Sequence, residues 1–168
     1  MTYEQMTWTC ETCGERIVGV EQGWVEWLYA APGRKVEEGE PAAKGMRLVH
    51  ARPYSPLKLS RTGCQYDEMA EYEASGYSLS SLELAHLMGP DGLMRLLFYI
   101  EEGEIPTGEV VELIKRLHIP GYEQARPHLE EGIAAGEVRP SIFPGVDDQE
   151  QIEQALRYAE IKLKDGRL

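Results

Sequence analysis

The sequence lacks any apolar run that approaches the roughly 18 residues a membrane-spanning helix needs. Its first ten residues, MTYEQMTWTC, have neither the basic start nor the apolar stretch of an export signal. It contains only three cysteines, and an odd number does not suit a secreted disulfide framework. These absences together predict a cytoplasmic protein in a reducing compartment, with no membrane partner.

Catalytic signatures are also missing: the chain has no glycine-rich phosphate loop, no H-E-x-x-H and no G-x-S-x-G. The most catalytic-looking group is His118, Tyr122, Arg126 and His128, which lie within eleven residues around Pro120 and could line a pocket. The competing interpretation is that His118 closes a helix while Arg126 pairs with neighbouring glutamates. We weigh the second interpretation higher, so the sequence leans against an enzyme and predicts no catalytic residue.

All three cysteines lie between residues 10 and 64, and one histidine lies between the second and the third. Three thiolates and one imidazole suit tetrahedral zinc, with Zn–S bonds of about 2.3 Å and Zn–N bonds of about 2.0 Å. Four protein ligands leave no open position on the ion, which makes such a site structural. The sequence therefore predicts a structural Zn²⁺ site formed by Cys10, Cys13, His50 and Cys64.

The C-x-x-C pair carries most of this prediction, because two thiols three residues apart can turn inward on one tight loop. Gly14 after Cys13 and Gly63 before Cys64 supply the permissive backbone that such turns use. The run C-E-T-C-G from Cys10 resembles the first half of a zinc ribbon, although the second half would be another C-x-x-C. Two alternatives stay open: a redox dithiol, which normally accompanies a βαβ pattern that is absent here, and separately buried cysteines.

His50 raises a geometric question. Residues 17–20, 24–29 and 46–51 are predicted as three strands. In a simple meander, His50 would lie on the order of 10 Å from the level of the C-x-x-C turn, at about 3.3 Å per residue. A shifted register, or pairing outside the meander order, would remove this gap. The alternatives are that His50 is a half-buried strand residue and that His86 is the fourth ligand.

The predicted strand around Trp24 is apolar on both faces. In an extended chain Trp24 faces one side, whereas Trp27 and Tyr29 face the other. Such a strand either has something packed on each side or displays aromatic rings to a partner. We take these three aromatic residues as candidate partner-binding residues, with burial in the core as the alternative.

The net charge of −12 is unevenly distributed. Residues 1–64 hold eight Lys or Arg and eight Asp or Glu, whereas residues 65–168 hold nine and twenty-one and so carry all of the −12. Residues 41–64 contain five cations and no carboxylate: Lys44, Arg47, Arg52, Lys58 and Arg61. This basic stretch could contact phosphate, or it could pair with carboxylates of its own chain.

After Cys64 the apolar pattern changes from a period of two to a helical period, which predicts a boundary near Tyr66. Ser80 and Glu83 form a capping box, so we expect a short helix to about Met88. The next helix, from Pro90 to Gly103, is apolar around nearly its whole circumference and should be buried. Further helices are expected from Thr107 to His118, from about Ala125 to Gly136, and from Asp147 with Glu150 completing its cap.

These observations predict an α+β protein in two parts. Residues 1–65 should form a zinc-stapled antiparallel β module that is zinc-ribbon-like, and residues 66–168 a compact acidic domain of four to five short helices. The favoured function is a non-catalytic protein–protein interaction or regulatory role, as an adaptor or inhibitor. The alternative is a nucleic-acid-binding accessory protein that uses the basic residues 44–61. Neither a partner nor an oligomeric state follows from the sequence.

Overall fold

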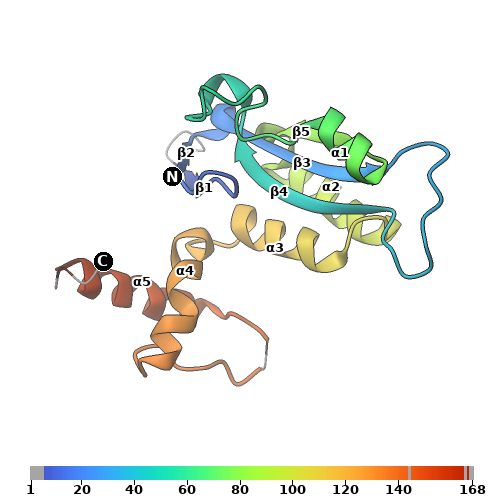
Figure 1. Ribbon diagram of the computed structural model, residues 1–168. Coiled ribbons are helices and arrows are strands. Elements are labelled where there is room, and N and C mark those ends of the chain that lie inside the picture. Colours follow the sequence, from blue (N-terminus) through green and yellow to red (C-terminus); the bar gives the residue numbers. More distant parts are fainter. Residues whose placement is uncertain (1–5, 144, 165, 167–168) are drawn as a thin grey trace. The chain divides into compact units, whose positions relative to one another are not determined.

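The computed structural model describes residues 6–143, 145–164 and 166 of the chain. It is an α+β structure with two small antiparallel sheets and five helices (Figure 1). The strands are β1 (Thr7–Thr9), β2 (Arg16–Val18), β3 (Gly23–Ala30), β4 (Ala43–His50) and β5 (Tyr77–Glu83). The helices are α1 (Glu68–Ser75), α2 (Gly89–Glu102), α3 (Thr107–His118), α4 (Tyr122–Ala134) and α5 (Gln149–Lys164). Within the described ranges, no helix combines the length and the apolar character that a bilayer crossing requires.

The chain divides into two compact units, which we call unit 1 (Met1–His118) and unit 2 (Ile119–Leu168). This division differs from the boundary expected near Tyr66. The reason lies in the larger sheet, whose strand order is β4-β3-β5, so its third strand comes from beyond Tyr66. All five strands and α1–α3 therefore belong to unit 1.

The predicted helix from Ser80 to Met88 is wrong. Residues Tyr77–Glu83 form β5, which pairs antiparallel with β3 along its whole length, with Ser80 opposite Trp27. Only Leu84–Leu87 turn helically, as a short 3₁₀ segment. A local capping box offers two hydrogen bonds, whereas the open edge of β3 offers a full ladder, so tertiary pairing overrides the local signal.

The strands do not form a simple meander. β2 pairs with β1, with Ile17 opposite Trp8, and β3 pairs with β4, with Gly23 opposite His50. His50 therefore ends its strand beside the start of β3, close to the short connection from β2. The strands pair outside the meander order, so the separation that a meander would place between His50 and the C-x-x-C turn does not arise.

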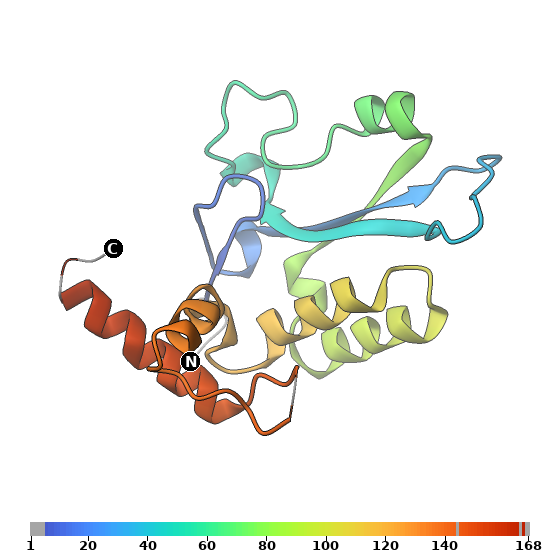
Figure 2. The same ribbon diagram turned by 60° about the horizontal axis from the view of Figure 1, so that its bottom comes forward.

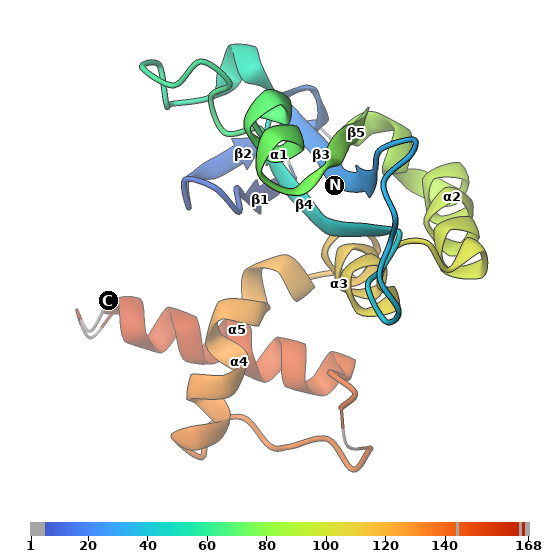
Figure 3. The same ribbon diagram turned by 45° about the vertical axis from the view of Figure 1, so that its right-hand side comes forward.

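The larger sheet lies between two helical layers. Figures 2 and 3 show α1 on one side of the sheet, and α2 and α3 side by side on the other. Asp67 caps α1 by accepting a bond from the Ala70 N–H, and Gly76 ends it in the left-handed conformation. Helix α1 was not predicted from the sequence, and none of its residues is buried. The core of unit 1 lies between the strands and α2–α3 and includes Trp8, Val25, Trp27, Leu48, Leu96, Val110 and Leu113.

Helix α2 has the predicted start and end, with Pro90 in its first turn and Gly103 as its C-cap. The expectation that it is buried all round is wrong. Met94, Leu97 and Phe98 are 66%, 42% and 51% exposed. These three side chains recur at three and four residues, so they form one apolar stripe on the outer face of the helix.

Unit 2 is a pair of helices with its own small core. Helix α4 starts three residues before the expected Ala125, so Pro127 lies inside the helix rather than in its first turn. The cap of α5 is shifted by one residue from the prediction, because Asp148 and Gln151 each accept a bond from the other's backbone N–H. The buried residues of unit 2 include Tyr122, Ala125, Leu129, Val138, Ile152 and Ala155.

Candidate metal centre

The structure brings together the four residues that the sequence selected as metal ligands. Sγ of Cys10, Cys13 and Cys64 and a ring nitrogen of His50 all lie within 4.8 Å of one another. Tetrahedral Zn–S bonds of about 2.3 Å hold two sulfurs roughly 4 Å apart, so the cluster is already close to the size of a coordination shell. Cys10, Cys64 and His50 are buried and Cys13 is partly buried. The four side chains could hold a metal ion.

The first two ligands lie on the turn between β1 and β2. The Cys10 N–H donates to the Glu15 carbonyl at 2.9 Å, and the Gly14 N–H donates to the Cys10 carbonyl at 2.9 Å. Gly14 has φ +75°, a conformation that side-chain-bearing residues rarely adopt. These bonds close a tight loop that turns both sulfurs toward the same point.

The third ligand, His50, is oriented by a bond from its far ring nitrogen. Nε2 lies 3.0 Å from the Arg16 carbonyl oxygen. A carbonyl oxygen can only accept, so Nε2 carries a proton, and in the neutral ring Nδ1 is then the nitrogen with a free lone pair. Nδ1 in turn lies 3.5 Å from Sγ of Cys13 and 3.8 Å from Sγ of Cys64. This is the arrangement of metal-ligating histidines, in which an outer carbonyl fixes the tautomer and the ring.

The fourth ligand, Cys64, is delivered by a loop that depends on Gly63. Gly63 has φ +64°, and a Cβ built on it would lie 2.8 Å from the Ser55 side chain. Ser55 itself is buried, with Oγ 3.1 Å from Sγ of Cys64. Thr12, inside the C-x-x-C turn, donates its hydroxyl to the Cys64 carbonyl at 2.7 Å. A direct hydrogen bond thus joins the C-x-x-C turn to the Cys64 loop.

The thiols differ in acidity for identifiable reasons. Burial opposes ionisation of Cys10, but backbone N–H groups of Cys13, Thr12 and His50 outweigh it and lower the pKa of the Cys10 thiol to about 7. Burial and the neighbouring sulfurs raise the pKa of Cys13 to about 12, and burial also raises the pKa of Cys64. One thiolate is therefore accommodated by the backbone alone, whereas a second and a third need a compensating positive charge. A divalent cation held by these residues would supply that charge.

Glu11, the residue after Cys10, ties the cluster to α3. Its carboxylate accepts bonds from the Leu48 N–H at 2.6 Å and from Nη1 of Arg116 at 2.6 Å. Arg116 is 3% exposed and also donates to the Thr9 carbonyl at 2.8 Å. The burial of Arg116 could not be predicted from the sequence, because Arg116 is one of several cations in the last turn of an acidic helix.

A second ion pair lies beside Cys64. Arg47 donates through Nε and Nη2 to Oε1 of Glu26, at 2.9 and 2.8 Å, and the Tyr66 N–H donates to the same oxygen. The Arg47 guanidinium also lies over the Tyr66 ring, 3.4 Å from its centre. Glu26 is fully buried, and burial raises the pKa of its carboxyl group despite Arg47. The pair fixes the backbone that follows Cys64, through the Cys64 carbonyl and the Tyr66 N–H.

The remaining histidines do not join the cluster. His86 is exposed in the 3₁₀ segment and is not among the four clustered residues. His118 donates from Nε2 to the Leu87 carbonyl at 2.9 Å, and burial lowers the pKa of its ring. Arg126 pairs with Glu123 at 3.6 Å within α4. The Arg126 pair is the one expected with a neighbouring glutamate, whereas His118, the last residue of α3, bonds a carbonyl outside its own helix.

The three candidate partner-binding residues have different surroundings. Trp27 is 8% exposed and packs against Tyr99 of α2, with ring centres 5.4 Å apart. Trp24 is partly buried on the other face of β3, and Tyr29 is 38% exposed. Of the three, Tyr29 has the largest exposed fraction, and the partner role of all three residues stays a prediction.

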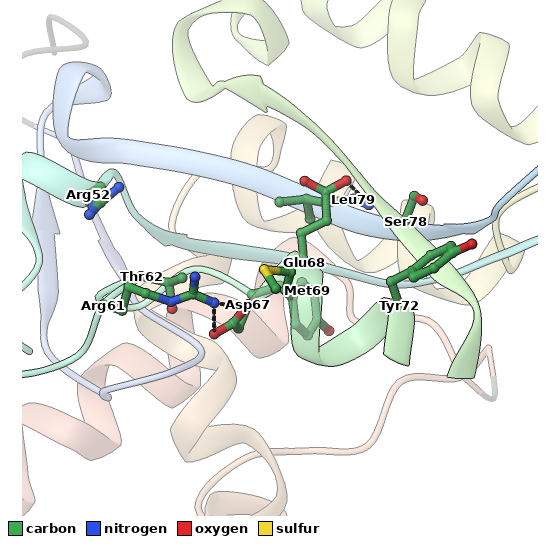
Figure 4. A pocket seen from close by; sticks show the side chains of 10 residues that line it. Arg52, Arg61, Thr62, Asp67, Glu68, Met69, Tyr72, Ser78 and Leu79 are labelled. Atoms are coloured by element: carbon green, nitrogen blue, oxygen red, sulfur yellow. Dashed lines mark hydrogen bonds and ion pairs between the residues drawn. The ribbon is translucent and has the colours of Figure 1, made fainter. Parts of the chain in front are cut away.

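One hollow of unit 1 lies beside α1 (Figure 4). It has a volume of about 560 Å³ and is lined by residues that include Arg52, Arg61, Asp67, Met69 and Tyr72. Arg61 donates to both oxygens of Asp67, so its charge is already paired. This hollow is wide and open, and its side chains do not converge on one chemistry.

Comparison with known proteins found no matching family model, no matching curated protein and no matching solved structure. The function therefore has to be argued from the chain's own residues.

Proposed function

We propose that this chain is a non-catalytic interaction protein whose unit 1 is held together by one structural zinc ion. The zinc assignment is supported by the donor set, since three thiolates and a neutral imidazole favour zinc over the oxygen-seeking Mg²⁺ and Ca²⁺. The number of ligands supports a structural rather than a catalytic ion, because four protein ligands leave no position for a substrate or water. The zinc-ribbon likeness of the Cys10–Gly14 turn belongs to the same proposal.

The single observation that carries the interaction role is the exposed apolar stripe of α2, Met94, Leu97 and Phe98. An amphipathic helix normally turns such a stripe inward, and α2 already buries another face against the core of unit 1. Exposed Tyr29 lines the same hollow as Phe98, so aromatic surface from β3 extends the stripe. Contiguous exposed apolar surface of this kind is typical of protein interaction sites.

The partner of this surface should be basic. Unit 1 contains 11 Lys or Arg and 19 Asp or Glu, and therefore a formal charge of −8. Complementary charge raises the association rate and disfavours wrong partners. Trp27 would form the floor of the surface and Tyr29 its rim, whereas Trp24, on the opposite face of β3, would have to contact a partner separately.

The test compares two methionines of similar exposure on opposite helical layers. Met94 of α2 and Met69 of α1 are 66% and 61% exposed. Met94→Glu should reduce capture of the wild-type protein's stoichiometric partner from native extract at least about tenfold, since a charge in an apolar interface is poorly tolerated. Met69→Glu should leave capture unchanged, and both variants should melt like wild type. Equal capture by all three proteins would refute the α2 surface.

Nucleic-acid binding through residues 44–61 is the second candidate. Arg47 and Arg61 are paired with Glu26 and Asp67, and Lys44 lies 3.9 Å from Glu40. In the part of the chain that the structure describes, Arg52 has no such carboxylate partner and lines a hollow of about 180 Å³ with Lys58. Phosphate binding there would weaken steeply with added salt. Salt also screens the attraction of a basic partner to the α2 surface, so substitution of Arg52, rather than salt alone, distinguishes the two candidates. The pairing of three of the five cations makes this candidate the weaker one.

A further inference from the structure

A small aromatic hollow lies where the end of β3 meets the end of α2. Trp27 and Tyr29 of β3 and Phe98 and Tyr99 of α2 line it, together with Glu102 and Glu104. Its volume is about 290 Å³, just below the ~300–1,000 Å³ of pockets for drug-sized ligands. The hollow therefore suits a single side chain better than a whole small-molecule ligand.

The rings present an electron-rich wall. Trp27 and Tyr99 are tilted by 58° with centres 5.4 Å apart, and Phe98 and Tyr99 are tilted by 54° with centres 6.3 Å apart. Aromatic faces carry partial negative charge and attract cations placed over them, tryptophan most strongly. Rings tilted in this way present both edges and faces to one small volume.

The two carboxylates at the rim are exposed. Glu102 is the last residue of α2, and the backbone carbonyl of Glu104 accepts a bond from the Ala43 N–H at 3.0 Å, which anchors the loop. Among the described residues, no Lys or Arg lines this hollow, and no salt bridge engages either carboxylate. The aromatic wall and the two unneutralised carboxylates both favour the same kind of ligand, an organic cation.

We propose that this hollow binds an arginine side chain of the basic protein partner, an inference that rests on the proposed interaction role. A planar guanidinium can stack on a ring and at the same time donate to carboxylates, whereas an ammonium does both less well. Its alkyl stem would lie against the apolar surface of Phe98, which continues into the stripe of α2. The arginine anchors the partner, and apolar residues flanking it occupy the stripe.

The test uses the full chain and N-acetyl-arginine amide as the probe, followed by NMR at the Trp27 indole N–H, which a Trp27→Phe variant assigns. The indole signal should shift saturably. N-acetyl-citrulline amide, which has the same shape without the charge, should bind at least about tenfold more weakly, a difference of about 1.4 kcal/mol. The lysine analogue should lie between the two.

Matched variants test whether arginine binding depends on the two rim carboxylates rather than on the overall negative charge of unit 1. Glu102→Gln with Glu104→Gln should weaken arginine binding about tenfold or more, whereas Glu101→Gln, an exposed neighbour on α2 outside the hollow, should not. Tyr29→Ala should weaken it, and Tyr54→Ala, 47% exposed elsewhere on unit 1, should not. Equal binding of arginine and citrulline, or no saturable shift, would overturn the inference.

The outcomes also distinguish this inference from the interaction role. If the probe fails to bind while partner capture still depends on Met94, the arginine site is refuted and the interaction role stands. If the probe binds but no partner is captured, the cation site stands and the interaction role fails. A dimer that Tyr29→Ala abolishes would identify a second copy of the chain as the occupant and overturn the assignment to a different partner.

Discussion

The ring of His50 donates its Nε2 proton to the carbonyl oxygen of Arg16, 3.0 Å away. This bond joins the end of β4 to the start of β2 and leaves Nδ1 facing the cysteine sulfurs. Two sheets that share no ladder are therefore joined at the candidate metal centre. The four-residue cluster therefore links the β1-β2 sheet to the β4-β3-β5 sheet.

Removal of the metal should loosen all of unit 1 rather than its first 65 residues alone. Cys10 and Cys64 belong to the same core as Leu96 of α2 and Val110 of α3. Zinc binding to small structural sites is worth about 10–16 kcal/mol, comparable with the whole stability of a domain. Amide hydrogen exchange of the full chain with a chelator should show lost protection in β3, β4 and α3. Amides of α4 and α5 should keep theirs, and unchanged exchange in β4 would contradict this prediction.

Gly63→Ala should disturb the metal centre through Ser55. The new Cβ would combine an unfavourable φ of +64° with a 2.8 Å approach to the Ser55 side chain, so the Cys64 backbone must shift. Backbone strain of this kind costs on the order of 1–3 kcal/mol. We expect a lower melting temperature and substoichiometric zinc.

Gly39→Ala is the matched control for that substitution. Gly39 also has positive φ, at +88°, but a Cβ there would meet nothing within 4 Å. The Gly39→Ala variant should lose stability from backbone strain alone and should retain full zinc content. If both variants bind zinc equally and melt together, the contact with Ser55 has no role in placing Cys64.

Much of the metal centre could be read from the sequence, whereas the sheet that surrounds it could not. Cys10 and Cys13 lie three residues apart in the chain, and glycines mark both turns, so local chemistry is sufficient to select them. The strand at Ser80 was missed because its pairing with Trp27 is a long-range contact, while the capping box is visible locally. Arg116 and Glu26 were missed for a related reason: a buried charge is recognisable only once its partner is placed.

The stability of unit 1 should fall in acid partly through Glu40. Arg34 donates to both Glu40 oxygens, at 3.0 and 2.7 Å, and the Tyr77 hydroxyl donates at 3.0 Å. The bonds from Arg34 and Tyr77 lower the pKa of Glu40 from its ordinary 4.5 to about 2. Because the folded-state pKa is depressed, this stabilisation is fully present above pH 4.5 and is lost as the pH falls toward 2.

The pH dependence can be checked by denaturant unfolding of wild type and Glu40→Gln. The amide does not titrate, so the variant should be less stable than wild type at pH 7 and should lose less stability between pH 4.5 and 2. Glu38→Gln, an exposed neighbour in the same loop, should follow the wild-type curve. Parallel curves for wild type and Glu40→Gln would show that Glu40 is not the group responsible.

X-ray absorption at the zinc edge, made on protein purified without added metal, examines the proposed site itself. We expect one zinc per chain with three sulfur neighbours at about 2.3 Å and one nitrogen at about 2.0 Å. His50→Ala should replace the nitrogen with an oxygen from water or lose the ion. A metal-free wild-type protein, or a zinc shell without three sulfurs and one nitrogen, would contradict the site formed by Cys10, Cys13, His50 and Cys64.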